Sequence, residues 1–176
     1  IRTDRVFSDA GTSDAQASGV SPEWFALASL RISQGRAIAQ PDDDALAAVA
    51  VLGSQAAHDL FPDGIAVGKL VKVNQTWLRV VRVLADRDLG QDKFEGIALG
   101  GESNRVFVPL ASARARFRFQ PLEDEIDRFT LSVANPDRLA DAARVLGAVM
   151  TQRHGGATDY RVIVPQQLYR QHQQTQ

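Results

Sequence analysis

Histidine and serine side chains could supply metal ligands or a nucleophile in this chain. The three histidines, His58, His154 and His172, lie far apart, and none has a second ligand-type residue three or four positions away. A helical metal site needs such a pair, because residues one turn apart share a helix face. No serine lies in the Gly-x-Ser-x-Gly pattern that exposes a nucleophile. We therefore expect no metal site, no cofactor site and no catalytic residue.

Two short motifs have residue types that bind a cation or a phosphate. The carboxylates of Asp42, Asp43 and Asp44 suit calcium or magnesium, but adjacent side chains seldom converge on one ion. We expect this run to lie in a solvated loop or a helix cap. The segment 64–70 contains Gly64 and Gly68 like a phosphate loop, yet it is one residue short between the two glycines and has Leu70 where Ser or Thr would hold magnesium. We expect a turn that leads into an edge strand.

Basic and aromatic residues could form a binding surface. Arg114, Arg116 and Arg118 alternate with apolar residues, which is the pattern of a basic strand face. Acidic residues follow at once, namely Glu123, Asp124, Glu125 and Asp127, so we expect surface pairing between the two signs. Trp24 and Phe25 have the size and character of core anchors.

The composition limits the class of protein. The 176 residues are 44% hydrophobic and include 20 Lys+Arg, 21 Asp+Glu and no Cys, which predicts one folded domain or two small lobes and excludes thiol chemistry. A net charge of −1 argues against nucleic acid as a partner. The longest uncharged apolar stretch, 45–53, is far shorter than the roughly 20 residues that span a bilayer. The chain starts without Met, so we expect a soluble piece of a longer protein.

The elements that position these residues alternate between strands and helices. After a loosely paired entry and an edge strand at 15–20, the run Ser21-Pro22-Glu23 predicts a helix start. Residues 30–32 are expected to be extended. The β-branched run 48–52 predicts a buried strand, followed by a helix capped by Ser54. The inward residues of that helix are expected to be Ala56, Ala57, Leu60 and Phe61. A hairpin of 69–74 and 77–84 completes a β–α–β–β block.

The second half of the chain repeats the alternation after a glycine-rich stretch. Residues 86–104 are expected to form a long loop, and 105–109 a short strand. The alternation at 129–133 predicts a half-buried strand, and 160–164 a closing strand. Between them, 135–137 begin a helix that ends at 154–156 and has its apolar face on Leu139, Ala142, Ala143, Leu146, Val149 and Met150. The pattern predicts an α+β fold of β–α–β units.

Several segments occur in an order that resembles a known family. The first half contains Gly19-Val20-Ser21-Pro22-Glu23-Trp24-Phe25, Gly35-Arg36, an acid at Asp43 or Asp44, Val49-Ala50-Val51-Leu52-Gly53, Leu60-Phe61-Pro62, Gly68-Lys69 and Val80-Val81-Arg82-Val83. The second half contains Val108-Pro109, Thr130 to Val133, Arg153-His154-Gly155, Asp159-Tyr160 and Gln173-Gln174-Thr175. This ordered set, which covers nearly the whole chain, resembles the extracytoplasmic core domain of MacB-type ABC transporter permeases.

The resemblance implies a domain between the first and second transmembrane helices of a four-helix permease. It implies a porter-like α+β core with a small inserted second lobe. We expect residues 1–85 to form the first part of the core lobe, 86–120 the inserted lobe, and 121–176 the second part. The stretch after Pro165 would be a C-terminal strut toward the membrane. Two departures from the family, a truncated first strand and helix and a short middle region, predict an incomplete β–α–β unit and a reduced second lobe.

The resemblance also implies a function without an active site in this domain. A cytoplasmic nucleotide-binding domain, fused or separate, would hydrolyse ATP, and the periplasmic domain would convert its motion into work such as export of a drug, peptide or lipoprotein. The implied partners are that nucleotide-binding domain, a second permease copy in a dimer and a periplasmic adaptor protein. The implied location is the periplasmic side of the inner membrane. The separate domain is expected to be largely monomeric, and no residue is assigned to a partner contact.

Two alternatives stay open from the residues alone. One is a separate α+β module that binds a peptide or small ligand in a groove lined by Trp24, Trp77 and the glycine-rich middle. The other is a hydrolase whose serine, histidine and acid come together only on folding.

Overall fold

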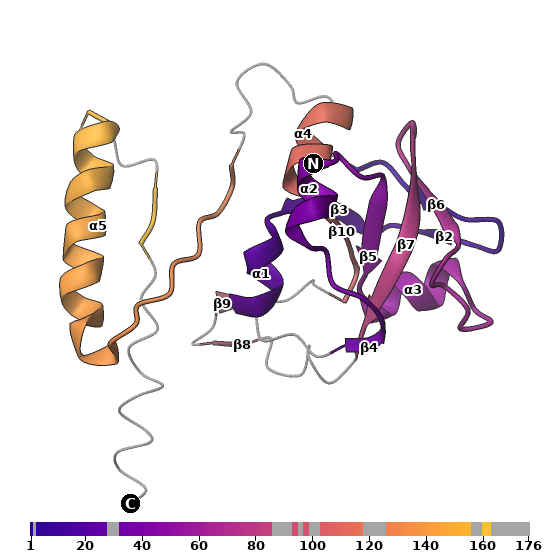
Figure 1. The fold of residues 1–176 in the computed structure, drawn as a ribbon, viewed down its shortest axis with the longest axis horizontal. Helices are drawn as coiled ribbons and strands as arrows, with labels where there is room; N and C mark the ends of the chain where they lie inside the picture. Colours follow the sequence, from indigo (N-terminus) through magenta and orange to yellow (C-terminus); the bar gives the residue numbers. More distant parts are fainter. Residues whose placement is uncertain are drawn as a thin grey trace, which may run out of the picture. The chain divides into compact units, whose positions relative to one another are not determined.

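The computed structural model describes residues 1, 3–27, 32–85, 93–94, 97–98, 103–117, 126–155 and 160–162. The chain divides into two units, Ile1–Thr130 and Leu131–Gln176, and each is described by itself. Unit 1 contains a mixed sheet with short helices, and unit 2 contains one long helix (Figure 1). Within the described ranges, no helix has both the length and the apolar character that a membrane span requires.

A single mixed sheet organises unit 1. Seven strands lie in the order β2-β1-β6-β7-β5-β10-β3, and β4 pairs with β7. The strands are β1 (Val6–Phe7), β2 (Thr12–Ser13), β3 (Gln16–Val20), β4 (Ile32–Gly35), β5 (Val49–Leu52), β6 (Leu70–Val73), β7 (Thr76–Leu84) and β10 (Arg105–Pro109). The pairs β5–β7 and β10–β3 are parallel, whereas the others are antiparallel. The predicted α+β class is confirmed.

The apolar run at 48–52, which predicts a buried strand, contains β5 in the interior of the sheet. β5 lies between β7 and β10, and its residues Ala50, Val51 and Leu52 are fully buried. A strand covered on both faces consists of consecutive apolar residues because both sets of side chains face a core. The prediction for 48–52 is therefore confirmed. β3 lies at the end of the sheet, as expected for an edge strand.

Helices on the two faces of the sheet bury separate apolar clusters. On one face α3 (Ser54–Leu60) and α4 (Leu110–Arg116) contribute to the larger cluster. α3 and the residue after it bury the four side chains predicted to point inward, Ala56, Ala57, Leu60 and Phe61. The predicted cap was wrong, because Gly53 is the N-cap and Ser54 is already helical. The hydrophobic pattern fixes which face of a helix is buried but places its first residue only within one or two positions.

The other face of the sheet is covered by α1 (Pro22–Leu27), which begins where the Ser-Pro-Glu signal predicts. Phe25 is 5% exposed and packs edge-on against Phe107 of β10, with ring centroids 6.0 Å apart. The Trp24 ring lies 4.8 Å from that of Phe107. Aromatic pairs at such distances contribute about 0.5–1.5 kcal/mol beyond the area they bury. The predicted role of Trp24 and Phe25 as core anchors is confirmed.

The predicted hairpin is formed by β6 and β7. They pair from Leu70 opposite Arg79 to Val73 opposite Thr76, and the turn between them has Asn74 at φ 51°. Asn tolerates this left-handed backbone better than most residues with a side chain. β6 also pairs with β1, so the prediction of an edge strand after 64–70 was wrong. The pairing with β1 could not be predicted, because the two residues of β1 are too few to show the alternation typical of a strand.

The middle of the chain contributes a separate pair of strands, one strand of the mixed sheet and one helix to unit 1. Within the expected long loop, β8 (Lys93–Phe94) pairs with β9 (Ile97–Ala98), and most of the remainder lies outside the described residues. The strand predicted at 105–109 is confirmed as β10, and α4 follows it directly. The division at residues 85 and 120 into a core lobe and an inserted lobe stays a prediction.

Unit 2 is built around the helix that the sequence marks most clearly. A 3₁₀ turn at Pro136–Arg138 leads into α5 (Leu139–Arg153), which ends at His154 and Gly155 as predicted. Most of the predicted apolar face is half-buried, but Val149 is 47% exposed. None of the side chains of α5 is fully buried. The amphipathic pattern is therefore present, and within the described part of this unit its apolar face is buried only in part.

Two strands predicted beside α5 are not formed in the described residues. The segment 129–133 is irregular, with Phe129 76% and Leu131 63% exposed. Residues 160–162 are also irregular, and 163–164 lie outside the described residues, as does the expected strut after Pro165. Alternation gives a segment the right side chains for a strand, but a strand also needs a neighbouring backbone to pair with.

Candidate functional site

Two of the three histidines lie in the described residues, one in each unit. His58 is exposed on α3, whereas His154 follows the last turn of α5 with its ring 5.4 Å from that of Tyr160. His172 lies outside the described residues. Across the parts of the chain that the structure describes, no three His, Cys, Asp or Glu side chains lie where they could hold a metal ion.

Of the three consecutive carboxylates, Asp42 forms an ion pair with Arg36. α2 (Gln40–Asp44) is a single short turn, and the Arg36 guanidinium donates to both oxygens of Asp42 at 2.6 and 2.7 Å. The amide of Ala39 donates to the same carboxylate at 2.9 Å. The hydrogen bonds from Arg36 lower the pKa of Asp42, while burial opposes the shift, and the carboxylate raises the pKa of Arg36. A bidentate pair of this kind fixes the loop before β5.

Asp43 joins α2 to α4. Its Oδ1 accepts a hydrogen bond from the amide of Ala111 at 2.8 Å, in the first turn of α4. The amides in the first turn of a helix lack partners within the helix, so this carboxylate acts as a cap supplied from another segment. Asp44 accepts from the side chain of Gln40 at 2.8 Å. The predicted loop-or-cap role of residues 42–44 is confirmed.

Two more hydrogen bonds connect α4 with the chain after α2. The hydroxyl of Ser112 donates to the carbonyl of Ala47 at 2.8 Å, and Arg116 donates to the carbonyl of Leu46 at 2.7 Å. Leu46 has φ 50°, a left-handed conformation that is costly for a residue with a branched side chain. We call these three contacts, from Ala111, Ser112 and Arg116 to Asp43, Ala47 and Leu46, the α2–α4 clasp. It fixes a strained turn directly before the central strand.

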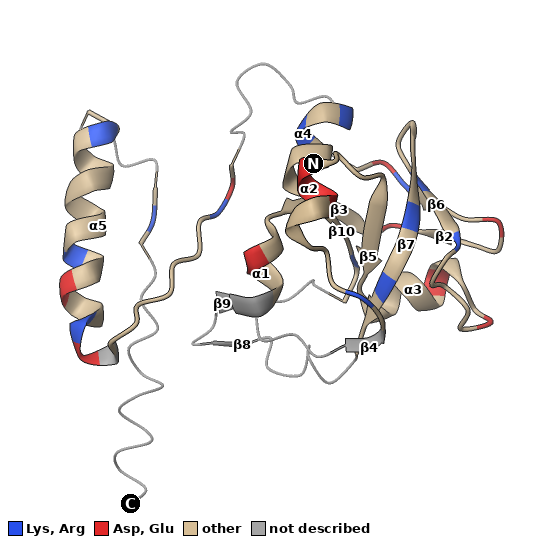
Figure 2. Ribbon diagram, in the orientation of Figure 1, with Lys and Arg blue, Asp and Glu red and all other residues tan. Residues whose placement is uncertain are grey.

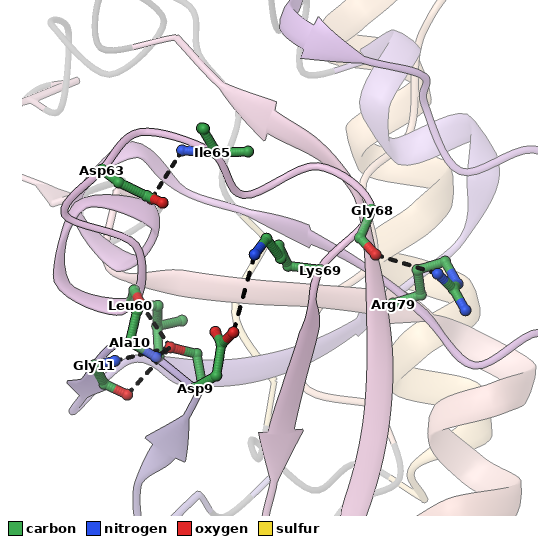
Figure 3. Close-up of polar contacts among 10 residues, drawn as sticks. Asp9, Ala10, Gly11, Leu60, Asp63, Ile65, Gly68, Lys69 and Arg79 are labelled. Atoms are coloured by element: carbon green, nitrogen blue, oxygen red, sulfur yellow. Dashed lines mark hydrogen bonds and ion pairs between the residues drawn. The ribbon is translucent and has the colours of Figure 1, made fainter.

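The glycine-rich segment 64–70 is the turn that the sequence predicts, not a phosphate site. Gly64 and Gly68 have φ values of 76° and 88°, which glycine adopts without a steric penalty. The amide of Ile65 donates to Asp63 Oδ1 at 3.1 Å, and the Arg79 guanidinium donates to the Gly68 carbonyl at 3.1 Å (Figure 3). The amide of Gly68 donates to Val80 at 2.7 Å. These two amides are engaged within the fold and are not free to bind an anion.

A serine turn next to this segment was missed by the sequence reasoning. The Ser8 hydroxyl donates to the carbonyl of Leu60 at 2.6 Å and accepts from the amides of Ala10 and Gly11 (Figure 3). It thereby connects the β1–β2 turn to the end of α3. The run Ser8-Asp9-Ala10-Gly11 has the residues typical of such turns, so the signal was present. Its long-range acceptor could not be read from the sequence.

The expected basic strand face at 114–118 is wrong for the residues described. Arg114 and Arg116 lie on α4, and Arg118 lies outside the described residues. Arg116 bonds to a backbone carbonyl, whereas three of the four acids expected to pair with these arginines, residues 123–125, lie outside the described residues. Basic residues at every second position over five residues can occur in a strand or in a short helix. A run this short therefore does not distinguish the two structures.

One buried cation was not identified from the sequence. Arg82 on β7 is 2% exposed, and its guanidinium carbon lies 5.8 Å from the centre of the Phe25 ring. A cation over an aromatic face is stabilised by the ring quadrupole, which compensates part of the cost of burial. Charged residues in a strand are ordinarily taken as solvent-facing, so Arg82 is the kind of residue that pattern reasoning misplaces.

The chain matches a protein family along most of its length. The family described as "MacB-like periplasmic core domain" matches residues 2–149. A curated relative, the macrolide export ATP-binding/permease protein MacB of Chromobacterium violaceum, is 32% identical over 145 residues, which are 81% of this chain and 20% of that protein. The chain thus spans about one fifth of the length of the curated relatives that it matches.

Two solved structures have the same fold. The periplasmic region of MacB from Actinobacillus actinomycetemcomitans matches with a TM-score of 0.68 at 17% identity, covering 99% of this chain and 73% of that one. The extracellular domain of the noncanonic ABC-type transporter YknZ from Gram-positive bacteria also matches with a TM-score of 0.68, at 15% identity, covering 92% of this chain and 76% of that one. At these identities the likeness establishes the fold alone.

Proposed function

This chain belongs to the MacB-like periplasmic core domains of ABC transporter permeases, and from that premise we propose that it converts ATP-driven motion into periplasmic work. The family match over residues 2–149 is the observation that carries the proposal. In this account ATP is hydrolysed by a cytoplasmic nucleotide-binding domain, fused or separate. Its conformational change reaches this domain through membrane helices, and the domain acts on a substrate or on an adaptor protein.

The partners and location follow from the same premise. We propose that the parent permease forms a dimer in the inner membrane, with this domain on the periplasmic side. A periplasmic adaptor is the third partner. The cargo is a drug, a peptide or a lipoprotein, and a macrolide is the first compound to test because relatives carry "macrolide export" in their names. The catalytic step lies outside this domain.

Contacts within unit 1 support such a role. A domain that passes on motion must move as a body, so its elements have to be connected by more than loops. The β5 strand is buried between β7 and β10. The α2–α4 clasp connects segments 65 to 70 residues apart in the chain. Well-packed interiors transmit strain because they are hard to compress.

The test separates ATP hydrolysis from export in the full-length gene product. One variant replaces residues 1–176 with a flexible linker, and a control replaces them with the matching segment of the Chromobacterium violaceum relative. We expect the linker variant to retain basal ATP hydrolysis and lose macrolide tolerance in cells, and the control to recover tolerance. Full tolerance with the linker variant would contradict the proposal, and so would a cytoplasmic location of this segment.

A further inference from the structure

We propose that the outer face of the β1–β6–β7 strands is a docking surface for a partner protein segment that presents carboxylates around an apolar side chain. The surface consists of Phe7, Leu70, Lys72, Trp77 and Arg79, and we call it the β6 face. This proposal does not depend on the transporter function, because its evidence is the residue content and exposure of three strands.

The alternation of the strands places these residues together. Val6, Val71, Val73, Leu78 and Val80 are fully buried and face the core. Successive side chains of a strand point to opposite faces, so the intervening residues lie on the other side. The register sets Phe7 beside Lys72 and Lys72 beside Trp77, and places Leu70 beside Arg79 in a neighbouring row. The β6 face is therefore one continuous patch across three strands.

The apolar members of the patch are exposed, although each could be buried by a partner. Phe7 is 43%, Leu70 46% and Trp77 53% exposed. Scattered apolar residues on a surface are ordinary, but a contiguous group that includes two aromatic side chains, Phe7 and Trp77, is typical of an interaction site. Trp, Phe and Arg are enriched in the parts of interfaces that contribute most to affinity. The composition thus favours a protein partner.

The charge of the patch determines the chemistry of that partner. The strands β1, β6 and β7 contain Lys72, Arg79 and Arg82 but no Asp or Glu. Figure 2 shows positively charged and no negatively charged residues along β7. Lys72 Nζ lies 5.9 Å from the centre of the Trp77 ring, and Arg79 is held by the Gly68 carbonyl at 3.1 Å. Lys72 and Arg79 are complementary to carboxylates of a partner, and the exposed apolar residues beside them are complementary to an apolar side chain placed between those carboxylates.

A nearby lysine provides a matched control. Lys69 directly precedes β6, and its Nζ lies 3.9 Å from Asp9 Oδ2. In Figure 3 the Lys69 side chain is directed toward Asp9, whereas the Arg79 side chain lies on the other side of the strand. Lys69→Glu therefore reverses a charge close to the β6 face in sequence without changing the face itself.

The experiment is photocrosslinking in cells that express the gene encoding this chain. A photoreactive phenylalanine, p-benzoylphenylalanine, replaces Leu70, and in a control it replaces Gln55, which is exposed on α3. Adducts are identified by mass spectrometry. We expect a protein adduct at position 70 whose crosslinked peptide contains at least two carboxylates beside an apolar residue. The yield should fall at least about fivefold in the Lys72→Glu/Arg79→Glu variant and stay unchanged in Lys69→Glu.

Circular dichroism of the purified 176-residue chain keeps the result interpretable, because the charge-reversal variants must retain the far-ultraviolet spectrum and unfolding midpoint of the parent. If the double variant fails to fold, Lys72→Gln/Arg79→Gln replaces it. A second copy of this chain or a phospholipid as the adduct at position 70 would overturn the proposal. A crosslinking yield at position 70 that is no higher than that at position 55 would also overturn the proposal. So would an adduct whose yield does not change in the charge-reversal variant.

Discussion

At the residue scale, Gly35 is the position where a single added carbon has the clearest consequence. Its φ is 85°, and a Cβ there would lie 2.0 Å from the carbonyl oxygen of Val81. Gly64 has a similar φ of 76° but open space around the position of a Cβ. Replacing either glycine by Ala therefore introduces backbone strain. The substitution at Gly35 also introduces a steric clash between β4 and β7, and the substitution at Gly64 does not.

We predict that Gly35→Ala lowers the free energy of unfolding by at least about 3 kcal/mol, and Gly64→Ala by about 1 kcal/mol. Urea denaturation of the two variants beside the parent chain measures both values. Equal losses would show that the β4–β7 contact is looser than described.

Asp42 gives the protein a stability component that depends on pH. Its folded pKa lies below the unfolded value because Arg36 stabilises the carboxylate. A carboxylate with a lowered pKa contributes stability above its unfolded pKa, about 3.9, and this is lost as the pH falls through the folded pKa. We predict that Asp42→Asn is less stable than the parent at pH 7 and that the difference shrinks below about pH 4. Urea unfolding at several pH values checks this, and a constant difference would contradict it.

The buried residues could be predicted from the sequence, but the interaction partners of the polar residues could not. The inward set on α3 and the anchors Trp24 and Phe25 follow from local periodicity. The partners of Ser8, Asp43 and Arg82 lie 52 or more positions away, so their contacts depend on the register of the whole sheet. No local pattern encodes that register. Among the polar residues at the candidate site, Asp42 and Asp43 were assigned the right kind of role without their partners, whereas the roles of Ser8 and Arg82 were not predicted.

At the element scale, α4 depends on a cap from outside its own sequence. The residue at its N-cap is Pro109, which has no side-chain hydrogen bond to offer, and Asp43 supplies the acceptor for Ala111. We predict that Asp43→Ala costs about 1 kcal/mol of unfolding free energy, while Asp44→Ala, one residue further and exposed, costs less than half as much. Guanidinium unfolding of the two variants distinguishes them. Similar losses for both would mean that the clasp contributes nothing specific.

α5 is weakly packed in the described part of the chain. None of its side chains is fully buried, and a 15-residue helix is only marginally stable in water by itself. We predict that in the 176-residue chain the amides of α5 exchange with deuterium at least about tenfold faster than those of β5 and β7. Hydrogen exchange read by mass spectrometry gives both rates from one sample. Equal protection would show that α5 is packed as firmly as the sheet.

Elements with a strong signal of their own were predicted, and those that depend on neighbours were not. β5, α3, the β6–β7 hairpin and α5 have long periodic or β-branched patterns. The two-residue strands β1 and β2 are too short for any pattern, and the segment 129–133 has the pattern but no paired backbone. Strand formation is decided by pairing as much as by composition.

At the scale of the whole molecule, the order of elements carries more information than any single motif. No residue cluster within the described ranges has metal-binding geometry, and the candidate phosphate loop is an ordinary turn. The family was recognisable from many weak segments in sequence, and the match over residues 2–149 establishes it. The proposed mechanical role would leave no catalytic signature, so it has to be tested in the protein that contains this domain.

The location of the domain is the central claim, and the absence of cysteine from the chain allows a direct test. Gln55 is exposed on α3, so Gln55→Cys introduces one accessible thiol. Intact spheroplasts that express the full-length gene are treated with a maleimide that cannot cross the membrane, and labelling of the peptide containing position 55 is compared with that in lysed cells. We predict equal labelling in both. Labelling only after lysis would place the domain in the cytoplasm and contradict the account.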